Sequence, residues 1–435
     1  MIMSPATITL IILIVMLILL GREIVPLGVM GIALPFIVVA FRLVEAKVAI
    51  GYFVTKTVVL VPCVYILGNA LFKVGIADSV GNIIKKFSNK CSKGEWFTVL
   101  LVMLSSAVGC MLLPRYGVTG ALMPIVVAVA RSTGISRTKL LLALPLASNI
   151  WGNNTLLSTP PNMLANGFLE QVGAPTFGFF EFALIGVPIG IAGTVAVVLF
   201  NKLMPARINE KMMYEQEDGK TDGRQSANVP KWKVVATYTI FAAFLLSIIF
   251  EKRIGVPFHI TAMTCSALVI ICGIATEKEC YSCVSWGIVW FLGGIQAFAK
   301  AMETSGAGEI VASLALKLLG TVDGSIPNVF LITAIMFGIS AIMTQFMSNT
   351  GAAGILFTIG ISVASTIGAD PRPVLMAITM GCGAAFMTPM ATPCNAMVME
   401  QGNILFNDYL RVGVPLMLTT GIVCTIGIPL IWPYF

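Results

Sequence analysis

Apolar runs long enough to cross the hydrocarbon core of a bilayer recur along almost the whole chain. A membrane-spanning helix needs about 20 mostly apolar residues. Because 57% of the 435 residues are hydrophobic and only 11% are charged, a water-soluble fold is excluded. The sequence therefore predicts an all-α polytopic membrane protein whose partner is the lipid bilayer. The formal net charge of +7 falls in loops, so it bears on topology and gives no reason to expect nucleic acid.

The apolar spans form a series that starts twice. The first series lies at 7–20, 25–44, 54–72, 97–113, 118–134, from 138 onward, and 181–203. A polar loop at 204–231 follows, and the second series then lies at 234–250, 255–276, 284–302, 326–346, 351–367, 372–399 and 409–432. More polar, amphipathic stretches occupy corresponding places in the two series, at 74–93 and 306–319. This pattern favours an internal repeat.

Four short patterns test the repeat, because they recur in the same order about 230 positions apart. They pair Pro26 with Pro257, the residues at 75–78 with those at 306–309, Thr-Pro-Pro-Asn at 159–162 with Thr-Pro-Cys-Asn at 392–395, and Phe-x-Glu-Phe at 179–182 with Phe-x-Asp-Tyr at 406–409. Chance can produce one or two such matches, but not the ordered set. Each half holds five spans and a hairpin, and an odd number of spans inverts the second half. We therefore expect two inverted-topology repeats of five transmembrane helices plus one re-entrant hairpin each.

The expected boundaries follow from these spans. Repeat 1 covers 1–203 with its hairpin at about 97–134, a polar linker covers 204–231, and repeat 2 covers 232–435 with its hairpin at about 326–367. Lys and Arg are enriched on cytoplasmic loops of membrane proteins. This rule places the central loop in the cytoplasm and both termini outside, in a multi-pass protein of the cell membrane. We also expect a homodimer.

Two short polar motifs interrupt the apolar sequence of the second half, Ser348-Asn349-Thr350 and Thr392-Pro393-Cys394-Asn395. Irregular backbone persists at membrane depth only where protein or a watery cavity satisfies it. Proline removes a donor and disfavours helix at the residue before it, so the second motif predicts a helix break. A single motif of this kind more often bonds to its own helix or joins neighbouring helices. The second copy at 159–162 shifts the balance towards a small-ion or anion site, as in secondary transporters.

Ser-Asn-Thr on a hairpin followed by Thr-Pro-x-Asn on a broken helix resembles the divalent anion/sodium symporter family of the ion transporter superfamily. That family carries di- and tricarboxylates or sulfate. The resemblance implies a sodium site at Thr344, Asn349 and Ala391, with sodium as the coupling ion and no other cofactor. It also implies that a small anionic substrate is bound by both hairpin tips and both Thr-Pro positions, which here are Ser348, Asn349, Thr350, Thr392, Pro393, Asn395, Thr159, Pro160 and Asn162.

The first hairpin departs from the family pattern. Arg115-Tyr116-Gly117 stands where the second half has Ser-Asn-Thr, and Met111 stands where it has Thr344. Two positions for Arg115 remain open: shallow, with the side chain reaching headgroups or the cytoplasm, or deep, where an arginine is costly and marks function. In the deep position Arg115 and Tyr116 join the substrate site, and the guanidinium replaces one sodium ion. Other polar side chains on the first broken helix lie nearby, namely Asn149, Asn153, Asn154, Thr155 and Ser158.

These features predict a secondary active transporter of small anions, favouring di- or tricarboxylates, that works by alternating access and couples to sodium at the second-repeat site. The alternatives are a sodium-independent anion exchanger, or an oxyanion exporter, with Arg115 replacing one cation. A membrane-embedded enzyme is a remote alternative, because His259 is the only histidine and no H-E-x-x-H or G-x-S-x-G occurs. Cys280 and Cys283 form a C-x-x-C without the second pair of ligands that a structural zinc site needs.

The orientation can be tested by labelling single cysteines in a cysteine-free background. Cysteines placed at 215–225 should react only from the cytoplasmic side, and those placed at 370–372 only from outside, because Lys and Arg are concentrated on the first side. Accessibility to a membrane-impermeant maleimide in intact and permeabilised cells measures this. The reverse pattern would reject the orientation while leaving the repeat intact.

Overall fold

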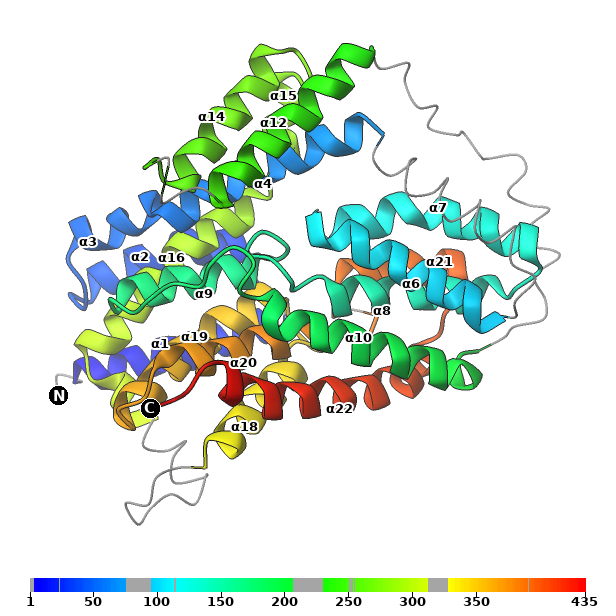
Figure 1. Cartoon of the computed structure of the whole chain (residues 1–435). Coiled ribbons are helices and arrows are strands. Elements are labelled where there is room, and N and C mark those ends of the chain that lie inside the picture. The colour runs from blue at the N-terminus through cyan, green and yellow to red at the C-terminus, as the bar shows by residue number, and fades with distance from the viewer. Residues whose placement is uncertain are drawn as a thin grey trace.

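The computed structural model describes residues 4–22, 24–75, 95–112, 115–205, 230–249, 253, 255–311, 328–389 and 391–435, and every regular element in this part of the chain is a helix (Figure 1). The first half contains α1 (Pro5–Gly21), α2 (Leu27–Ala40), α3 (Ala46–Gly51), η1 (Tyr52–Val54), α4 (Lys56–Lys73), α6 (Glu95–Leu112), α7 (Arg115–Thr133), α8 (Arg137–Trp151), α9 (Pro160–Gln171), α10 (Ala183–Leu199) and η2 (Phe200–Leu203). The second half contains α12 (Lys231–Ile249), α14 (Phe258–Ile271), α15 (Glu277–Cys283), α16 (Trp286–Thr304), α18 (Val329–Met343), α19 (Asn349–Thr366), α20 (Pro371–Gly383), α21 (Pro393–Gly402) and α22 (Phe406–Ile431). Nearly all of the amphipathic stretch at 74–93, most of the central loop and part of the stretch at 306–319 lie outside the described residues.

Proline sets the start of corresponding helices in the two halves. Pro26 and Pro257 immediately precede α2 and α14, while Pro160 and Pro393 are the first residues of α9 and α21. Proline is favoured at a helix start because its missing N–H would have no partner there. The sequence missed the short helices α3 and α15, which precede α4 and α16, because six or seven residues are too few to show a helical period.

The helices of the two halves pack on one another in a reciprocal pattern. α2 packs on α16 and α4 on α14, while α10 lies beside α22 (Figure 1). α9 contacts α19 and α20 of the second half, and α21 contacts α7 and α8 of the first half. Each helix that follows a break is therefore held by helices of the opposite half.

Large apolar side chains point outward from this bundle. Phe36, Leu199, Ile271 and Leu430 are each about 70–77% exposed. Such exposure is unfavourable in water but suits hydrocarbon. Among the described residues, the stretch Ala46–Leu71 and α22 are each long and apolar enough to cross a membrane, as are α15 and α16 together across a 55° bend. Several other apolar helices are shorter, including α1, α2, α10 and α18.

α2 and α16 cross at glycines, which allows their backbones to touch. A methyl group on Gly294 would overlap the carbonyl oxygen of Gly31, and one on Gly31 would overlap the backbone of Trp290 and Phe291. Small residues at a helix crossing permit the close approach that stabilises association in a membrane. This crossing is a rigid contact between the two halves, remote in sequence from the breaks.

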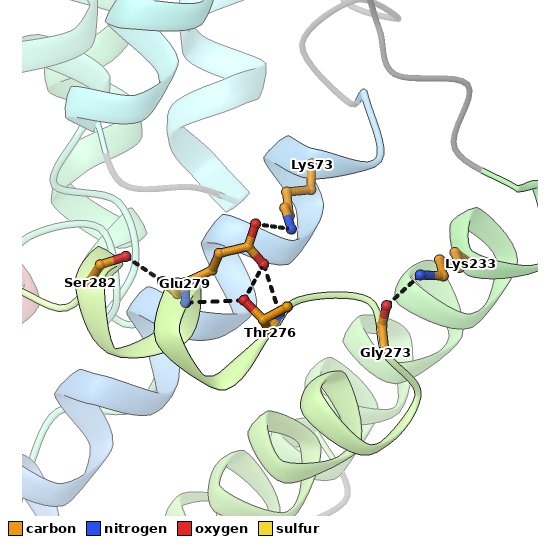
Figure 2. A network of polar contacts seen from close by, with 6 residues as sticks. All are labelled: Lys73, Lys233, Gly273, Thr276, Glu279 and Ser282. Atoms are coloured by element: carbon orange, nitrogen blue, oxygen red, sulfur yellow. Dashed lines mark hydrogen bonds and ion pairs between the residues drawn. The ribbon is translucent and has the colours of Figure 1, made fainter.

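Polar contacts join the two halves at a second place, near the end of α4 (Figure 2). Lys73 Nζ lies 2.7 Å from Glu279 Oε1 on α15, while the other carboxylate oxygen of Glu279 accepts from the Thr276 backbone N–H at 2.7 Å. Nearby, and within the second half, Lys233 of α12 donates to the carbonyl of Gly273, just beyond α14. The Lys73 and Glu279 side chains are 36% and 43% exposed, so this ion pair adds little stability and serves mainly to fix local geometry.

The α2–α16 crossing predicts the effect of adding a methyl group. Gly294→Ala should destabilise the protein by about 1–3 kcal/mol, because the backbones must separate to admit the new atom. Gly51→Ala is the matched control, since a methyl group there meets nothing within 4 Å. Thermal unfolding in detergent measures both variants. An unchanged midpoint for Gly294→Ala would show that the crossing is looser than described.

Candidate functional site

Both broken helices close their loops with the asparagine that ends the Thr-Pro-x-Asn motif. Asn162 Nδ2 donates to the Thr155 carbonyl at 2.7 Å, and Asn395 Nδ2 donates to the Thr388 carbonyl at 2.8 Å. These carbonyls have lost their helical partners and, inside a membrane, have no water to replace them. The two motifs thus perform the same local task in the two halves, which is to hold a non-helical turn at the end of a helix.

The motif threonines are buried and differ in their partners. Thr159 Oγ1 donates to Asn162 Oδ1 at 2.8 Å, whereas Thr392 Oγ1 accepts from the Asn395 backbone N–H at 3.4 Å. Pro160 is buried like these threonines, but Pro393 is exposed. Thr159, Asn162, Thr392 and Asn395 are therefore all buried, whereas Pro393 is exposed.

The segment between α18 and α19, together with the first turn of α19, is called the second tip and places several oxygen atoms together. Ser348 caps α19 by accepting from the Gly351 N–H at 3.1 Å, and Asn349 and Thr350 form the first turn of the helix. Thr344 Oγ1 lies 2.8 Å from Asn349 Oδ1 and 3.1 Å from the Cys382 carbonyl oxygen. A hydroxyl, an amide oxygen and a carbonyl are the ligands that a hard cation prefers. Ala391, the third predicted sodium ligand, is buried, with its N–H donated to Thr388 Oγ1 at 3.2 Å.

Gln345 stitches the second tip to the turn that follows α20. Its Nε2 donates to the Ala384 carbonyl at 2.9 Å, and its Oε1 accepts from the Met387 N–H at 3.0 Å. Its own carbonyl accepts from Thr388 Oγ1 at 2.9 Å. No motif in the sequence marks Gln345, which is a single glutamine in an otherwise apolar stretch.

The start of α7 is called the first tip, and Arg115 there is completely buried. This side chain is 0% exposed at the first position of α7, so the guanidinium packs inside the protein and does not reach solvent; its depth in the bilayer stays a prediction. Its Nη1 donates to Asn149 Oδ1 at a long 3.4 Å, and its guanidinium carbon lies 5.4 Å from the centre of the partly buried Tyr116 ring. The side chain of Met111 lies outside the described atoms.

Both tips carry buried donors that have no hydrogen-bond partner among the described residues. At the first tip these are Nε and Nη2 of Arg115, and at the second tip the atom is Nδ2 of Asn349. A buried donor left unpaired costs about 1–3 kcal/mol, and more when it is charged. An acceptor on a bound anion would satisfy donors of either kind, the guanidinium N–H groups or the amide N–H.

Hydrogen bonds connect the two tips through the breaks. Asn149 Nδ2 donates to Asn395 Oδ1 at 3.0 Å and to the Ala385 carbonyl at 3.1 Å. Asn395 in turn bonds Thr388, and Thr388 bonds the backbone next to Thr344. The structure thus joins Arg115 of the first half, through Asn149, to Asn395 and Thr388 of the second, while the bonds of Thr159 and Asn162 described above stay within the first half. Asn149 has a central place that no motif indicated.

Open space beside this network is small. A cavity of about 10 Å³, lined in part by Asn149, Asn153 and Phe386, has room for roughly one water molecule. A larger cavity of about 470 Å³ lies at the C-terminal ends of α9, α16 and α19. Phe168, which lines the larger cavity, packs edge to face on Phe357 at a centroid distance of 5.6 Å. Along α9 this contact lies between the cavity and the first break.

Buried polar breaks in an apolar helical bundle define the chain as a membrane transporter, and comparisons with known proteins identify the family. The family described as "Citrate transporter" matches residues 2–381. The chain therefore belongs to the citrate transporter family, within the divalent anion/sodium symporters, as its motifs indicated. It is a transporter family, not an enzyme family.

Three relatives show the range of similarity. An uncharacterized transporter of Methanocaldococcus jannaschii is 25% identical, over 93% of this chain and 89% of that protein. A sodium-dependent dicarboxylate transporter of Staphylococcus saprophyticus is 23% identical, over 63% of this chain and 55% of its own. The Na⁺/citrate cotransporter of Rattus norvegicus is 38% identical, over 30% of this chain and 22% of its own.

Two solved structures share the fold. The YdaH transporter of Alcanivorax borkumensis has a TM-score of 0.61 at 14% identity, covering 88% of this chain and 89% of that one. MtrF of Neisseria gonorrhoeae, which its title places among antimetabolite efflux pumps, has a TM-score of 0.61 at 15% identity, covering 98% and 95%. At this level of identity the likeness concerns the fold alone.

Asn349→Ala should abolish transport while the protein still accumulates in the membrane. The substitution removes both an oxygen of the tip and its open donor, so ion and substrate lose a ligand together. Asn328→Ala on the same hairpin is the control, because Asn328 caps the exposed start of α18 and its loss costs only about 1 kcal/mol. Uptake into proteoliposomes, normalised to reconstituted protein, compares them. Uptake by Asn349→Ala at the rate of the control would refute the assignment.

Proposed function

We propose that this chain is a secondary active transporter of small anions, with di- or tricarboxylates as its substrates, coupled to sodium through the second-repeat site. The observation that carries the proposal is the pair of open donor sets at the two tips, on Arg115 and on Asn349. A substrate with carboxylates at both ends supplies an acceptor to each set. The printed names of the citrate and dicarboxylate relatives support the same substrate class.

Sodium coupling is proposed at the second tip only. Thr344 Oγ1 lies 2.8 Å from Asn349 Oδ1 and 3.1 Å from the Cys382 carbonyl oxygen, and the Ala391 carbonyl is the fourth oxygen in this assignment. Two of the relatives named above are sodium-dependent, which supports sodium as the ion. Substrate contacts are assigned to Ser348, Asn349, Thr350, Thr392, Pro393, Asn395, Arg115, Tyr116, Thr159, Pro160 and Asn162.

At the first tip Arg115 takes the place of a second cation. Its charge is permanent at physiological pH, and it sits where the second half has Ser348 in the hairpin motif. It is buried with one long hydrogen bond and the Tyr116 ring as its neighbours, so a carboxylate would supply the anionic partner that its charge lacks among them. A transporter built this way needs fewer sodium ions per substrate than one with two cation sites.

Alternating access by two inverted-topology repeats, 1–203 and 232–435, completes the proposal. Its support is the matching order of helices, their reciprocal packing and hydrogen bonds that recur in both halves. Besides the bonds from Asn162 and Asn395, Gly178 N–H donates to Glu181 at 2.8 Å and Leu405 N–H donates to Asp408 at 2.7 Å. A cytoplasmic linker at 204–231, outside termini and a homodimer in the cell membrane stay predictions.

A sodium-independent anion exchanger is the second candidate, and the buried Arg115 favours it, because a fixed charge can balance the substrate without a co-transported ion. Uptake of radiolabelled succinate, citrate, tartrate, 2-oxoglutarate and sulfate into proteoliposomes, with and without sodium, separates the two. Sodium-stimulated uptake into empty liposomes supports the symporter. Uptake that requires an internal anion and does not depend on sodium supports the exchanger. Sodium-independent export of an oxyanion supports the oxyanion exporter. Transport of none of these anions would refute both.

Arg115→Ser should weaken substrate affinity roughly ten- to a hundredfold, since a charge-assisted hydrogen bond contributes about 1.5–3 kcal/mol. Arg115→Lys should recover only part of it, because an ammonium does not reproduce the planar fork. Apparent affinity is measured across a sodium titration for each variant. Arg131→Ser, at the exposed far end of α7, is the control. Affinity of Arg115→Ser equal to that of the control at every sodium concentration would exclude Arg115 from the site.

A further inference from the structure

Asn149 stands between the charged tip of one half and the broken helix of the other. It lies near the end of α8 and is 1% exposed. Its amide nitrogen donates to Asn395 Oδ1 at 3.0 Å and to the Ala385 carbonyl at 3.1 Å, and both partners belong to the second half. Its amide oxygen accepts from Arg115 Nη1 at 3.4 Å.

The orientation of this amide is fixed by chemistry. A backbone carbonyl can only accept, so the group facing Ala385 must be the amide nitrogen. Asn395 uses its own Nδ2 to donate to Ala385 and Thr388, so it presents oxygen to Asn149. Turning the Asn149 amide over would set its oxygen against two acceptors and its nitrogen against a cation. The oxygen must therefore face Arg115.

This orientation selects one edge of the guanidinium. Nη1 is engaged by Asn149, whereas Nε and Nη2 have no partner among the described residues. The N–H groups of Nε and Nη2 lie side by side and form a fork that matches the two oxygens of a carboxylate. The stem of Arg115 is also held, because it packs against Gly152, where a methyl group would lie 3.0 Å from Cδ.

We propose that Asn149 is a positioning residue that fixes which edge of Arg115 meets the substrate, so that one carboxylate of the anion binds Nε and Nη2 together. The inference rests on the proposed function and deepens it, since it assigns the atoms that recognise the substrate at the first tip. The same amide holds Asn395, so the orientation of the first tip depends on the second break. In the register that aligns Thr159 with Thr392, the counterpart of Asn149 is Cys382, whose thiol cannot do this.

Asn149→Asp is the decisive substitution, because it keeps the size of the side chain and replaces the amide nitrogen with an anionic oxygen. The new carboxylate pairs with Arg115 itself and removes the charge that the substrate needs. Affinity for radiolabelled citrate or succinate, measured as equilibrium binding to the purified protein, should fall roughly ten- to a hundredfold. Asn166→Asp is the matched control: it is also buried and also loses a donor to a carbonyl, that of Phe177 at 2.8 Å.

A double-mutant cycle separates positioning from general damage. The cycle uses Asn149→Ser, which removes the amide without adding a charge. In the Arg115→Ser background it should cost little further affinity, since the guanidinium that Asn149 positions is gone. Additive losses of Arg115→Ser and Asn149→Ser would overturn the inference, and so would a single Asn149→Asp variant that binds as tightly as Asn166→Asp. If Asn149→Asp does not accumulate as folded protein, the cycle with Asn149→Ser alone carries the test.

The outcomes also distinguish this inference from the proposed function. Failure of the unmodified chain to bind any carboxylate would overturn both. Binding that depends on Arg115 but not on Asn149 would overturn the inference alone. Non-additive losses at Arg115 and Asn149, with Asn166→Asp near the unmodified affinity, are the result that we expect.

Discussion

Hydrocarbon offers no hydrogen bonds, and this constraint governs everything at the two breaks. Each break frees backbone carbonyls, and the chain satisfies one of them with its own asparagine, Asn162 to Thr155 and Asn395 to Thr388. The helix after each break packs on helices of the other half, so polar side chains near the breaks come to lie between the halves. A polar interior follows from the need to end two helices inside an apolar bundle.

The same framework carries different chemistry at its two tips. At the second tip Thr344 Oγ1 and Asn349 Oδ1 lie 2.8 Å apart, and oxygens are the ligands that the proposed sodium ion prefers. At the first tip the positive charge belongs to the chain, because Arg115 is buried with one long hydrogen bond. Burying a charge without full compensation is unfavourable. In the proposed function the first tip therefore carries its own positive charge for the anion, whereas the second relies on a bound cation.

Helix breaks could be predicted from the sequence because proline acts locally. α9 and α21 begin at Pro160 and Pro393, within the breaks that the sequence predicted. The complete burial of Arg115 within the protein could not be predicted, since it depends on packing between segments far apart in the chain. Pro393 shows a second limit, because a repeated motif placed one proline inside and the other at the surface. The role of Asn149 was also hidden, for it depends on which atoms of Ala385 and Asn395 face it.

The bond between Asn149 and Asn395 has a consequence for how access to the site can change. At 3.0 Å it joins the two breaks across the halves, and Asn395 and Thr388 continue the connection to the second tip. Any movement that preserves these bonds carries both breaks together. Elsewhere the halves meet at the glycine crossing of α2 and α16, where the backbones are too close to admit even a methyl group. Between the crossing and the breaks, α4 packs on α9 within the first half and α16 packs on α19 within the second. The 470 Å³ cavity at the ends of α9, α16 and α19 lies along the second of these contacts, so that contact is not filled by side chains along its whole length.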